Sequence, residues 1–523
     1  MVTQRMRPYL EGPAVAAAPV WSVDPRTGKQ REQVAVEATA QEVDAAVRAA
    51  RAAGGALADR AVRSAFLRSA AAGLDAAADG LIGTADAETA LGPVRLTGEL
   101  ARTVYQLRAF ADIVDEGAFL DVIINHPDDT ATPPVPDLRR YRVPLGVVAV
   151  YSASNFPFAF SVAGGDTASA LAAGCPVVVK AHPDHPALSE LVAGVLRRAA
   201  AEHGIPEGVV GLVHGFEAGV ELIGHPLVAA AGFTGSVRGG RALFDAAAAR
   251  AVPIPFHGEL GSLNPVLVTE EAAAERAEAI GSGLAGSMTL GVGQFCVKPG
   301  LVLVPSGDAG DRLLKSLADA VGDTAAGVLL DHRMRDNFIA GVAERAQLPG
   351  VETPVTPGAG GEHTVSAGFL TVPASGLTAE GAYDLLLEEC FGPVTVVVRY
   401  ADDGEATAVL SRLPGNLTAT VHLSAGEAAG EGRGAEILAE LTPLAGRVLV
   451  DAWPTGVAVA PAQHHGGPYP ATTSTSTSVG GTAIERWLRP VAYQNTPEAL
   501  LPRELRDDNP LGLPRRFNGL LER

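Results

Sequence analysis

The sequence predicts an α/β protein whose first half forms a doubly wound parallel sheet. Short apolar, β-branched runs alternate with helix-like segments over residues 146–260, and this alternation is typical of parallel strands joined by crossover helices. A second α/β region is expected over residues 262–459, with strands in NPVLV, GLVLVP, VTVVVRY and RVLVDAW. The five strands expected in the first sheet are GVVAVYSA (146–153), PVVVK (176–180), GVVGLVHG (208–215), LVAAAGFTGS (227–236) and PIPFHGEL (253–260).

Helices and loops follow from the spacing of apolar residues. Residues 41–80 and Glu99–Glu116 interleave apolar and charged side chains as amphipathic helices do. Helices are also expected over Phe158–Ala173 and from about Pro186 to His203. The Pro- and Asp-rich stretch Asn125–Arg139 interrupts regular structure and predicts an excursion or a hairpin arm.

The tail from His464 has a different composition. It contains the low-complexity run TTSTSTS (472–478), and then AIERWLRPVAYQ (483–494), which predicts a strand or helix that packs on another surface such as a partner subunit. We find no internal repeat that would indicate a solenoid or propeller.

Length and composition limit the possible functions. A chain of 523 residues exceeds one hydrophobic core, so two or three domains are expected. The net charge of −19 argues against a nucleic-acid partner, because phosphate-binding surfaces need clustered Lys and Arg. Three cysteines without a disulfide spacing indicate a reducing, cytoplasmic compartment. The N-terminus, MVTQRMRPYLEGP, lacks the apolar core of a signal peptide, and no apolar run is long enough to predict a membrane span.

The most informative residue is Cys296, in the glycine-rich and nearly uncharged loop TLGVGQFCVKPG. The alternative is a buried structural cysteine, but strands of a core avoid flanking glycines such as Gly293 and Gly300. A thiol in a loop where backbone can approach closely suits nucleophilic attack on a carbonyl. Such a thiol needs a nearby base or a helix N-terminus to help it ionise.

Two other polar residues follow predicted strands of the first sheet. Glu259, in HGELGSLNP, could accept a proton from water or from the thiol, or it could be an exposed loop carboxylate. Asn155, in SASNFPF, could donate its amide N–H to an oxyanion, or it could cap the helix expected near Phe158. Because ligands bind beyond the carboxyl ends of strands in such sheets, we expect these residues to share one edge.

Candidates for nucleotide binding lie at the same edge. Lys180 ends the strand VVVK and could meet a ribose or extend to solvent. In FTGSVRGG, Gly235, Ser236 and Gly240 lie at a strand-to-helix turn, where backbone N–H groups can bind phosphate. In EECFGPV, Glu389 and Phe391 could hold a ribose and wall a ring, or form a solvated turn beside a core Phe. His464 and His465 could form a metal pair, but no Cys or carboxylate lies at ligand spacing in the sequence, so no metal is expected.

The motifs SASNFPF, VVVK, FTGS, HGELGSLNP, GQFC and EECFGPV, in this order, resemble the aldehyde dehydrogenase superfamily over nearly the whole chain. The resemblance implies that Cys296 attacks an aldehyde, that Asn155 holds the oxyanion, and that Glu259 activates water to hydrolyse the resulting thioester. It also implies that Lys180, Gly235, Ser236, Glu389 and Phe391 bind a nicotinamide cofactor.

The family architecture divides the chain into three parts. It implies a cofactor domain over 1–124 and 143–260, a catalytic domain over 261–463, and an oligomerisation arm with the C-terminal tail over 125–142 and 464–523. We therefore expect a homodimer or homotetramer that binds a small-molecule aldehyde.

Two departures from the common family pattern refine the expectation. Family members that prefer NAD commonly carry Glu three residues after the lysine, and here that position is Pro183. Its absence removes a repulsion toward a 2′-phosphate, and Arg238 replaces a frequent acidic residue. NADP is therefore the expected cofactor, with NAD as the alternative.

The second departure concerns the substrate. GQFCVKPG, HHGGPYPATT and RTVYQLRAFA together resemble the α-ketoglutaric semialdehyde (2,5-dioxopentanoate) dehydrogenases and the related NADP-linked fatty aldehyde dehydrogenases. A carboxylated substrate needs Arg in its tunnel, whereas a long-chain aldehyde needs an apolar tunnel. The residues expected to contact substrate are Arg102, Arg108, Phe156, Phe160, Phe295 and His465.

Two further alternatives stay open at this point. A catalytically silent homologue with a binding or structural role would not need Asn155, Glu259 and Cys296 together. A coenzyme A-acylating enzyme is disfavoured because Glu259 would hydrolyse the thioester before thiol exchange.

Overall fold

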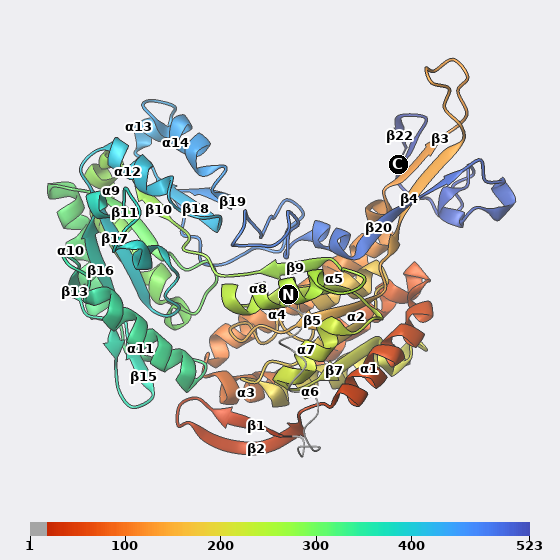
Figure 1. Cartoon of the computed structure of the whole chain (residues 1–523), viewed down its shortest axis with the longest axis horizontal. Helices are drawn as coiled ribbons and strands as arrows, with labels where there is room; N and C mark the ends of the chain where they lie inside the picture. Colours follow the sequence, from red (N-terminus) through yellow and green to blue (C-terminus); the bar gives the residue numbers. More distant parts are fainter. Residues whose placement is uncertain (1–17, 523) are drawn as a thin grey trace.

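The computed structural model describes residues 18–522, which form three large sheets (Figure 1). A seven-stranded sheet lies at the left of the view, a five-stranded sheet lies in the centre, and a second five-stranded sheet extends to the upper right. The predicted α/β class with parallel sheets is therefore confirmed.

The central sheet is parallel throughout and has the strand order β7-β6-β5-β8-β9. The chain runs outward from β5 to one edge and then returns to build the other, so the order reverses between β5 and β8. Ligands bind at such reversal points in doubly wound sheets. Each strand lies within its predicted run; the bounds are β5 Val147–Tyr151, β6 Val177–Lys180, β7 Val210–Val213, β8 Val228–Thr234 and β9 Phe256–Glu259.

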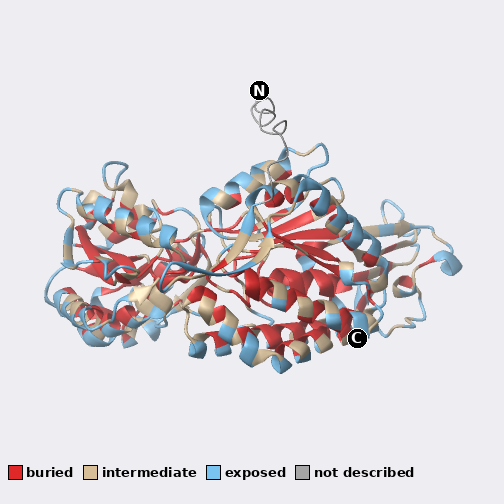
Figure 2. Ribbon diagram, turned by 90° about the horizontal axis from the view of Figure 1, so that it is seen from below, coloured by how far each residue is buried: buried red, intermediate tan, exposed pale blue. Residues whose placement is uncertain are grey.

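Helices cover both faces of this sheet, which explains why its strands are apolar along their whole length. In β5, Val148 and Val150 join one buried cluster while Val147 and Ala149 join another, as the two-residue period of a strand requires. Buried residues accordingly fill the layers between helices and sheet in Figure 2. One face carries α2 Arg60–Ala76, α4 Pro93–Glu116, α5 Gly165–Ala173 and α6 Pro186–Glu202, and the other carries α1 Ala40–Ala53, α7 Phe216–Gly224 and α8 Val237–Ala248.

The seven-stranded sheet has the order β13-β16-β17-β11-β10-β18-β19, parallel except for the edge strand β13. The sequence predicts β10, β11, β17 and β19 but misses β13, β16 and β18. In β18, Thr418 and Thr420 are fully buried, so hydroxyls interrupt the apolar pattern by which a buried strand is recognised. The bounds are β10 Val266–Val268, β11 Leu301–Pro305, β13 Glu352–Val355, β16 Gly368–Pro373, β17 Val394–Tyr400, β18 Asn416–His422 and β19 Ala445–Val450.

Six helices accompany this second sheet. The longest pair, α9 and α10, packs together on one side, and its buried residues share a cluster with Val266, Val302 and Val397 of the sheet. The bounds are α9 Glu270–Thr289, α10 Asp308–Gly322, α11 His332–Ala346, α12 Asp403–Leu410, α13 Ala425–Ala428 and α14 Gly434–Leu441.

The third sheet forms an arm that projects from the body (Figure 1). The predicted hairpin is present, because β3 and β4 pair antiparallel around the Pro- and Asp-rich turn. The strand predicted near Val491 pairs with it, and Val491 lies opposite Tyr141. The order is β20-β4-β3-β21-β22, with bounds β3 Val122–Asn125, β4 Leu138–Pro144, β20 Leu488–Gln494, β21 Arg515–Phe517 and β22 Leu520–Glu522.

One prediction about local structure is wrong. Residues 158–164 are turns and bends rather than helix, and Gly164 has an extended backbone (φ −72°, ψ −174°), so α5 begins only at Gly165. The buried carboxylate of Glu99 accepts the backbone N–H groups of Phe158 and Ala159 in this turn segment. The segment from His464 to Ser478 does not belong to the arm. Thr472 forms a β-bridge with Glu259, so this segment lies against the central sheet.

The remaining elements are peripheral. They are the hairpin of β1 Pro19–Asp24 and β2 Lys29–Val36, the helix α3 Ala78–Thr89, and a small sheet of β12 Gly327–Val328, β14 Gly358–Ala359 and β15 Thr364–Ser366. Over residues 18–522, no helix combines the length and the apolar character needed to cross a membrane.

Candidate active site

The polar residues predicted at strand ends do share one edge of the central sheet. Lys180 and Glu259 are the last residues of β6 and β9, and Asn155 and Gly235 follow β5 and β8. Because all five strands are parallel, their carboxyl ends place these side chains around one reversal point of the sheet.

The loop with Cys296 enters this edge from the second sheet, between α9 and β11. Gly293 has a φ of +67°, and a Cβ there would lie 2.3 Å from the carbonyl oxygen of Gly392, so only glycine fits. Asn264 holds the loop from below: its side-chain N–H donates to the carbonyls of Cys296 at 2.8 Å and Lys298 at 3.0 Å. The thiol is thus carried on a fixed backbone.

His465 connects Cys296 to Glu259. Its Nε2 lies 2.9 Å from Oε1 of Glu259 and 3.7 Å from Sγ of Cys296. The side chains of His465 and Glu259 are 0% and 3% exposed, so water does not compete for this contact. Sequence reasoning placed His465 among the substrate residues, whereas the structure places it between the thiol and the carboxylate.

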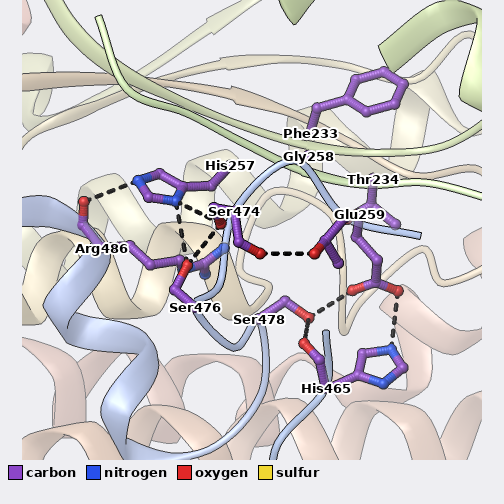
Figure 3. A pocket seen from close by; sticks show the side chains of 11 residues that line it. Phe233, Thr234, His257, Gly258, Glu259, His465, Ser474, Ser476, Ser478 and Arg486 are labelled. Carbon is purple, nitrogen blue, oxygen red and sulfur yellow. Dashed lines mark hydrogen bonds and ion pairs between the residues drawn. The ribbon is translucent and has the colours of Figure 1, made fainter. Parts of the chain in front are cut away.

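The Ser/Thr-rich segment forms the wall of this site (Figure 3). The hydroxyl of Ser478 donates to the other oxygen of Glu259 at 2.5 Å. The backbone N–H of His465 donates to the hydroxyl of Thr477 at 2.8 Å. The low-complexity run therefore supplies hydroxyls that satisfy buried polar groups, which a buried carboxylate requires.

These contacts set the protonation states of Glu259 and Cys296. Burial alone would raise the pKa of Glu259, but His465 and the Ser478 hydroxyl hold it below its usual range. Burial and the nearby Glu259 carboxylate raise the pKa of the Cys296 thiol well above its usual range. The site thus holds an ionised carboxylate beside a thiol that needs a proton acceptor before it can attack.

Asn155 faces the same loop. Its side-chain Nδ2–H donates to the carbonyl of Gln294 at 3.0 Å, and its backbone carbonyl accepts a hydrogen bond from Nη2 of Arg95 at 2.5 Å. Arg95 thus fixes the backbone of Asn155, while the side-chain amide is directed at the backbone that leads to Cys296. Sequence reasoning did not identify Arg95.

The residues expected to bind the cofactor divide into two groups. Gly235 and Ser236 are exposed at the start of α8, where Ser236 accepts the N–H of Gly239 at 3.2 Å and leaves the helix end accessible, a site suited to phosphate. Gly240 is buried, and a Cβ there would meet Leu260 and Phe233, so its absence of a side chain serves packing.

Glu389 reaches this edge from the second sheet. Its Oε2 lies 2.4 Å from the position of a Cβ on Gly261, two residues after Glu259, so the glycine allows the carboxylate to approach. Burial raises the pKa of Glu389 to about 7. Phe391 is half-buried beside it. The exposed helix start, Lys180 and this carboxylate are chemically suited to a nucleotide with a pyrophosphate and two riboses.

Of the residues expected to contact the substrate, Arg108 alone does not line the site. Phe156 packs edge-on against Phe160 and Phe295, with ring centroids 5.4 and 5.3 Å apart. The Arg102 guanidinium lies over the Phe160 ring, 5.5 Å from its centroid. Arg108 does not line the site, because it is exposed on the opposite side of α4 and pairs with Asp75 at 2.6 Å.

The structure also brings together ligand types that sequence spacing kept apart. Glu259, Cys296 and His465 offer atoms that all lie within 4.8 Å of one another. The sequence places no Cys or carboxylate at ligand spacing from His464 and His465, and only tertiary contact reveals this arrangement. The contacts of His465 with Glu259 and Cys296 connect the three side chains into one acid–base unit.

Comparisons with known proteins agree with this geometry. Residues 15–461 match the model of the aldehyde dehydrogenase family. The chain belongs to the aldehyde dehydrogenase family. It is 47% identical over 468 residues, or 88% of each chain, to "Alpha-ketoglutaric semialdehyde dehydrogenase 2" of Azospirillum brasilense. It is 42% identical over 440 residues, or 83% of this chain and 82% of the relative, to "Alpha-ketoglutaric semialdehyde dehydrogenase" of Acinetobacter baylyi.

A solved aldehyde dehydrogenase shares the fold. Gamma-glutamyl-gamma-aminobutyraldehyde dehydrogenase of Burkholderia cenocepacia superposes with a TM-score of 0.77 at 23% identity, covering 91% of this chain and 92% of that one. As an aldehyde dehydrogenase, the chain is an oxidoreductase that uses a nicotinamide cofactor and acts on aldehydes. The expectation of a silent homologue is not favoured.

Proposed function

We propose that this aldehyde dehydrogenase oxidises α-ketoglutaric semialdehyde (2,5-dioxopentanoate) to the dicarboxylate, with Cys296 as nucleophile. The observation that carries the chemistry is the buried contact of Glu259, His465 and Cys296. The names of the two relatives described above support the choice of substrate.

In the first half-reaction, the Cys296 thiol loses its proton to the hydrogen-bonded Glu259–His465 pair and attacks the aldehyde carbon. The amide of Asn155 and the backbone N–H of Cys296 hold the oxyanion of the thiohemiacetal, and such donors typically stabilise a transition state by about 3 kcal/mol. The bound cofactor supplies the hydride acceptor. The product of this half-reaction is a thioester on Cys296.

In the second half-reaction, Glu259 accepts a proton from water, which attacks the thioester and releases the acid. The pair must first pass the thiol proton to solvent, because a protonated Glu259 cannot act as a base. Ser478 and His465 favour the ionised form of Glu259, and thus keep it ready for this step.

We propose NADP as the preferred cofactor and NAD as the alternative. Pro183 places no carboxylate three residues after Lys180. Asp184 lies nearby, but burial and the neighbouring Asp331 raise the pKa of its carboxyl, which reduces negative charge where a 2′-phosphate would bind. In Pro183→Glu, the Kd for NADP should rise relative to that for NAD; an unchanged ratio contradicts the assignment.

The substrate is tested with purified protein and a panel of aldehydes. We expect kcat/KM to be highest for 2,5-dioxopentanoate, lower for succinic semialdehyde, and lowest for hexanal and longer aldehydes. A preference for the long apolar aldehydes would instead support the fatty aldehyde dehydrogenase alternative.

The arm, the domain limits and the compartment complete the proposal. We assign the cofactor domain to 1–124 and 143–260, the catalytic domain to 261–463, and the oligomerisation arm with the C-terminal tail to 125–142 and 464–523. Exposed Leu520 and Leu521 on this arm support a homodimer or homotetramer, and we assign it to the cytoplasm because three cysteines without a disulfide spacing suit a reducing compartment. The mass of the particle, measured by light scattering with and without the arm hairpin, tests the oligomer.

A further inference from the structure

We infer that Arg102, assisted by Arg95, forms a subsite for the carboxylate at the far end of the substrate. The inference rests on the proposed function, because it concerns the aldehyde that Cys296 attacks. It assigns the recognition of an oxo-acid to one face of α4.

The sequence spacing places three charged residues on that face. Arg95, Glu99 and Arg102 lie at i, i+4 and i+7 of α4, so they project in the same direction. The opposite face, with Arg108, is exposed to solvent. Charged side chains directed into a protein interior require partners.

Arg102 has fewer partners than its position requires. Its Nε donates to the carbonyl of Val457 at 3.3 Å. Its Nη1 and Nη2 are buried and have no hydrogen-bond partner among the residues that the structure describes. These two nitrogens form the face of a guanidinium that binds a carboxylate in a bidentate manner.

The two terminal nitrogens of Arg95 differ in their hydrogen bonds. Its Nη2 donates to the carbonyl of Asn155, whereas its Nη1 is buried and without a partner in the described part of the chain. Its guanidinium lies 4.6 Å from the centroid of the Phe295 ring, next to the nucleophile. Arg95 therefore adds positive charge beside the site while it positions the oxyanion donor.

The local charge also favours an anion. Glu99 lies between the two arginines, and one of its oxygens accepts the N–H groups of Phe158 and Ala159. On this face of α4 two guanidinium groups accompany one carboxylate, and the next negative charge is that of Glu259 at the reacting end of the site. A substrate carboxylate would therefore meet positive charge at α4.

Arg102 lies near the reacting groups, since its charge lowers the pKa of the Cys296 thiol. The Phe160 ring lies between the two ends of the site: its centroid is 5.5 Å from the Arg102 guanidinium and 6.2 Å from the centroid of the His465 imidazole. A substrate that joins the two ends would therefore pass beside this ring. A long apolar aldehyde would leave the guanidinium without a partner, which disfavours such substrates.

The experiment compares Arg102→Gln with wild type on 2,5-dioxopentanoate and on pentanal, an uncharged aldehyde of equal carbon number. Because Arg102 also lowers the pKa of Cys296, both aldehydes report any effect on the thiol. The ratio of their kcat/KM values cancels that effect. We expect this ratio to fall about 100-fold, the loss typical of a buried charged hydrogen-bond pair.

Two further variants complete the design. Arg108→Gln is the matched control on the same helix and should leave the ratio unchanged. Arg102→Lys keeps the charge but not the bidentate geometry, and should lower the ratio about 10-fold, so it replaces the Gln variant should that fail to fold. The Ki of 2-oxoglutarate as a product inhibitor should rise in parallel with the loss.

The outcomes separate the inference from the proposed function. A ratio within about threefold of wild type in the folded Arg102 variants overturns the carboxylate subsite. Wild-type enzyme that prefers long apolar aldehydes overturns the proposed substrate. A third outcome is that wild-type enzyme prefers succinic semialdehyde, and that Arg102→Gln lowers the ratio of kcat/KM for this substrate to kcat/KM for an uncharged aldehyde by the same factor. This outcome overturns the substrate assignment and supports the subsite.

Discussion

The two loops that meet at the proposed nucleophile, Cys296, differ in amino-acid composition. The loop around Cys296 is glycine-rich and almost free of charge, and its backbone is held by Asn264. The segment from His465 to Ser478 is rich in hydroxyls, and its side chains hold Glu259 and one another. One loop thus presents a reactive atom on a rigid backbone, and the other tunes the proton affinity of its partners. The following predictions test this division of roles.

Cys296→Ala should have the largest effect. Aldehyde-dependent reduction of the cofactor should fall at least about 10⁴-fold, because removal of a nucleophile eliminates the covalent route. The Kd of the cofactor, measured by fluorescence titration, should change little. Cys175→Ala is the matched control, because that thiol is buried away from the site; turnover in the Cys296 variant similar to that of the control would exclude the nucleophile.

Glu259→Gln should lower steady-state turnover about 10³-fold, the upper part of the range for a general base. A rapid burst of reduced cofactor should remain, because without the Glu259 carboxylate the Cys296 thiol ionises more easily and can lose its proton to solvent. Because the Glu259 carboxylate raises the pKa of Cys296, its removal lowers that pKa and makes thiolate available at lower pH. Stopped-flow burst rates should therefore shift their rise to lower pH; a shift to higher pH would contradict this role.

His465→Gln should lower kcat/KM about 100-fold, because the Nε2–H that holds Glu259 in its ionised, proton-accepting form is lost. The adjacent His464→Gln serves as control and should retain activity near that of wild type. Equal losses in both variants would indicate a general disturbance of the loop rather than a specific role of His465.

Ser478→Ala should have the smallest effect, about a 10-fold loss in steady-state turnover, as expected for one hydrogen bond to a charged group. The hydroxyl lowers the pKa of Glu259, so its removal should shift the pH dependence of deacylation upward. Thr475→Ala removes an exposed hydroxyl of the same segment and should be neutral. An unchanged pH profile in Ser478→Ala would remove this residue from the proton balance.

The comparison also explains what the sequence could and could not predict. Cys296 can be predicted as a site residue because a lone thiol among glycines is unusual. Lys180 and Glu259 can be predicted because they end apolar strands. Ser478 cannot be predicted as a site residue, because its sequence neighbours are chemically alike. Only its tertiary contact with Glu259 distinguishes it from them. Arg95 and Arg102 share a helix with Arg108, and periodicity alone does not say which face is buried.

The same limit applies to the fold. The central sheet follows from its apolar runs because helices cover both of its faces. The strand β18 is not predicted because two of its buried positions carry threonine. The Thr418 hydroxyl donates to Asn264 at 3.0 Å, whereas the Thr420 hydroxyl is buried without a hydrogen-bond partner among the described residues. Polar side chains that the tertiary structure buries therefore account for the missed strand as well as the missed site residues.

The bridge between Thr472 and Glu259 has a consequence for the order in which the enzyme is made. Glu259 and Cys296 are synthesised well before His465 and Ser478, which lie near the C-terminal end of the chain. A nascent chain therefore carries its thiol and Glu259 before the two groups that keep Glu259 ionised have been translated. We therefore expect full competence to react with aldehydes to be gained last, when the C-terminal segment docks against the central sheet.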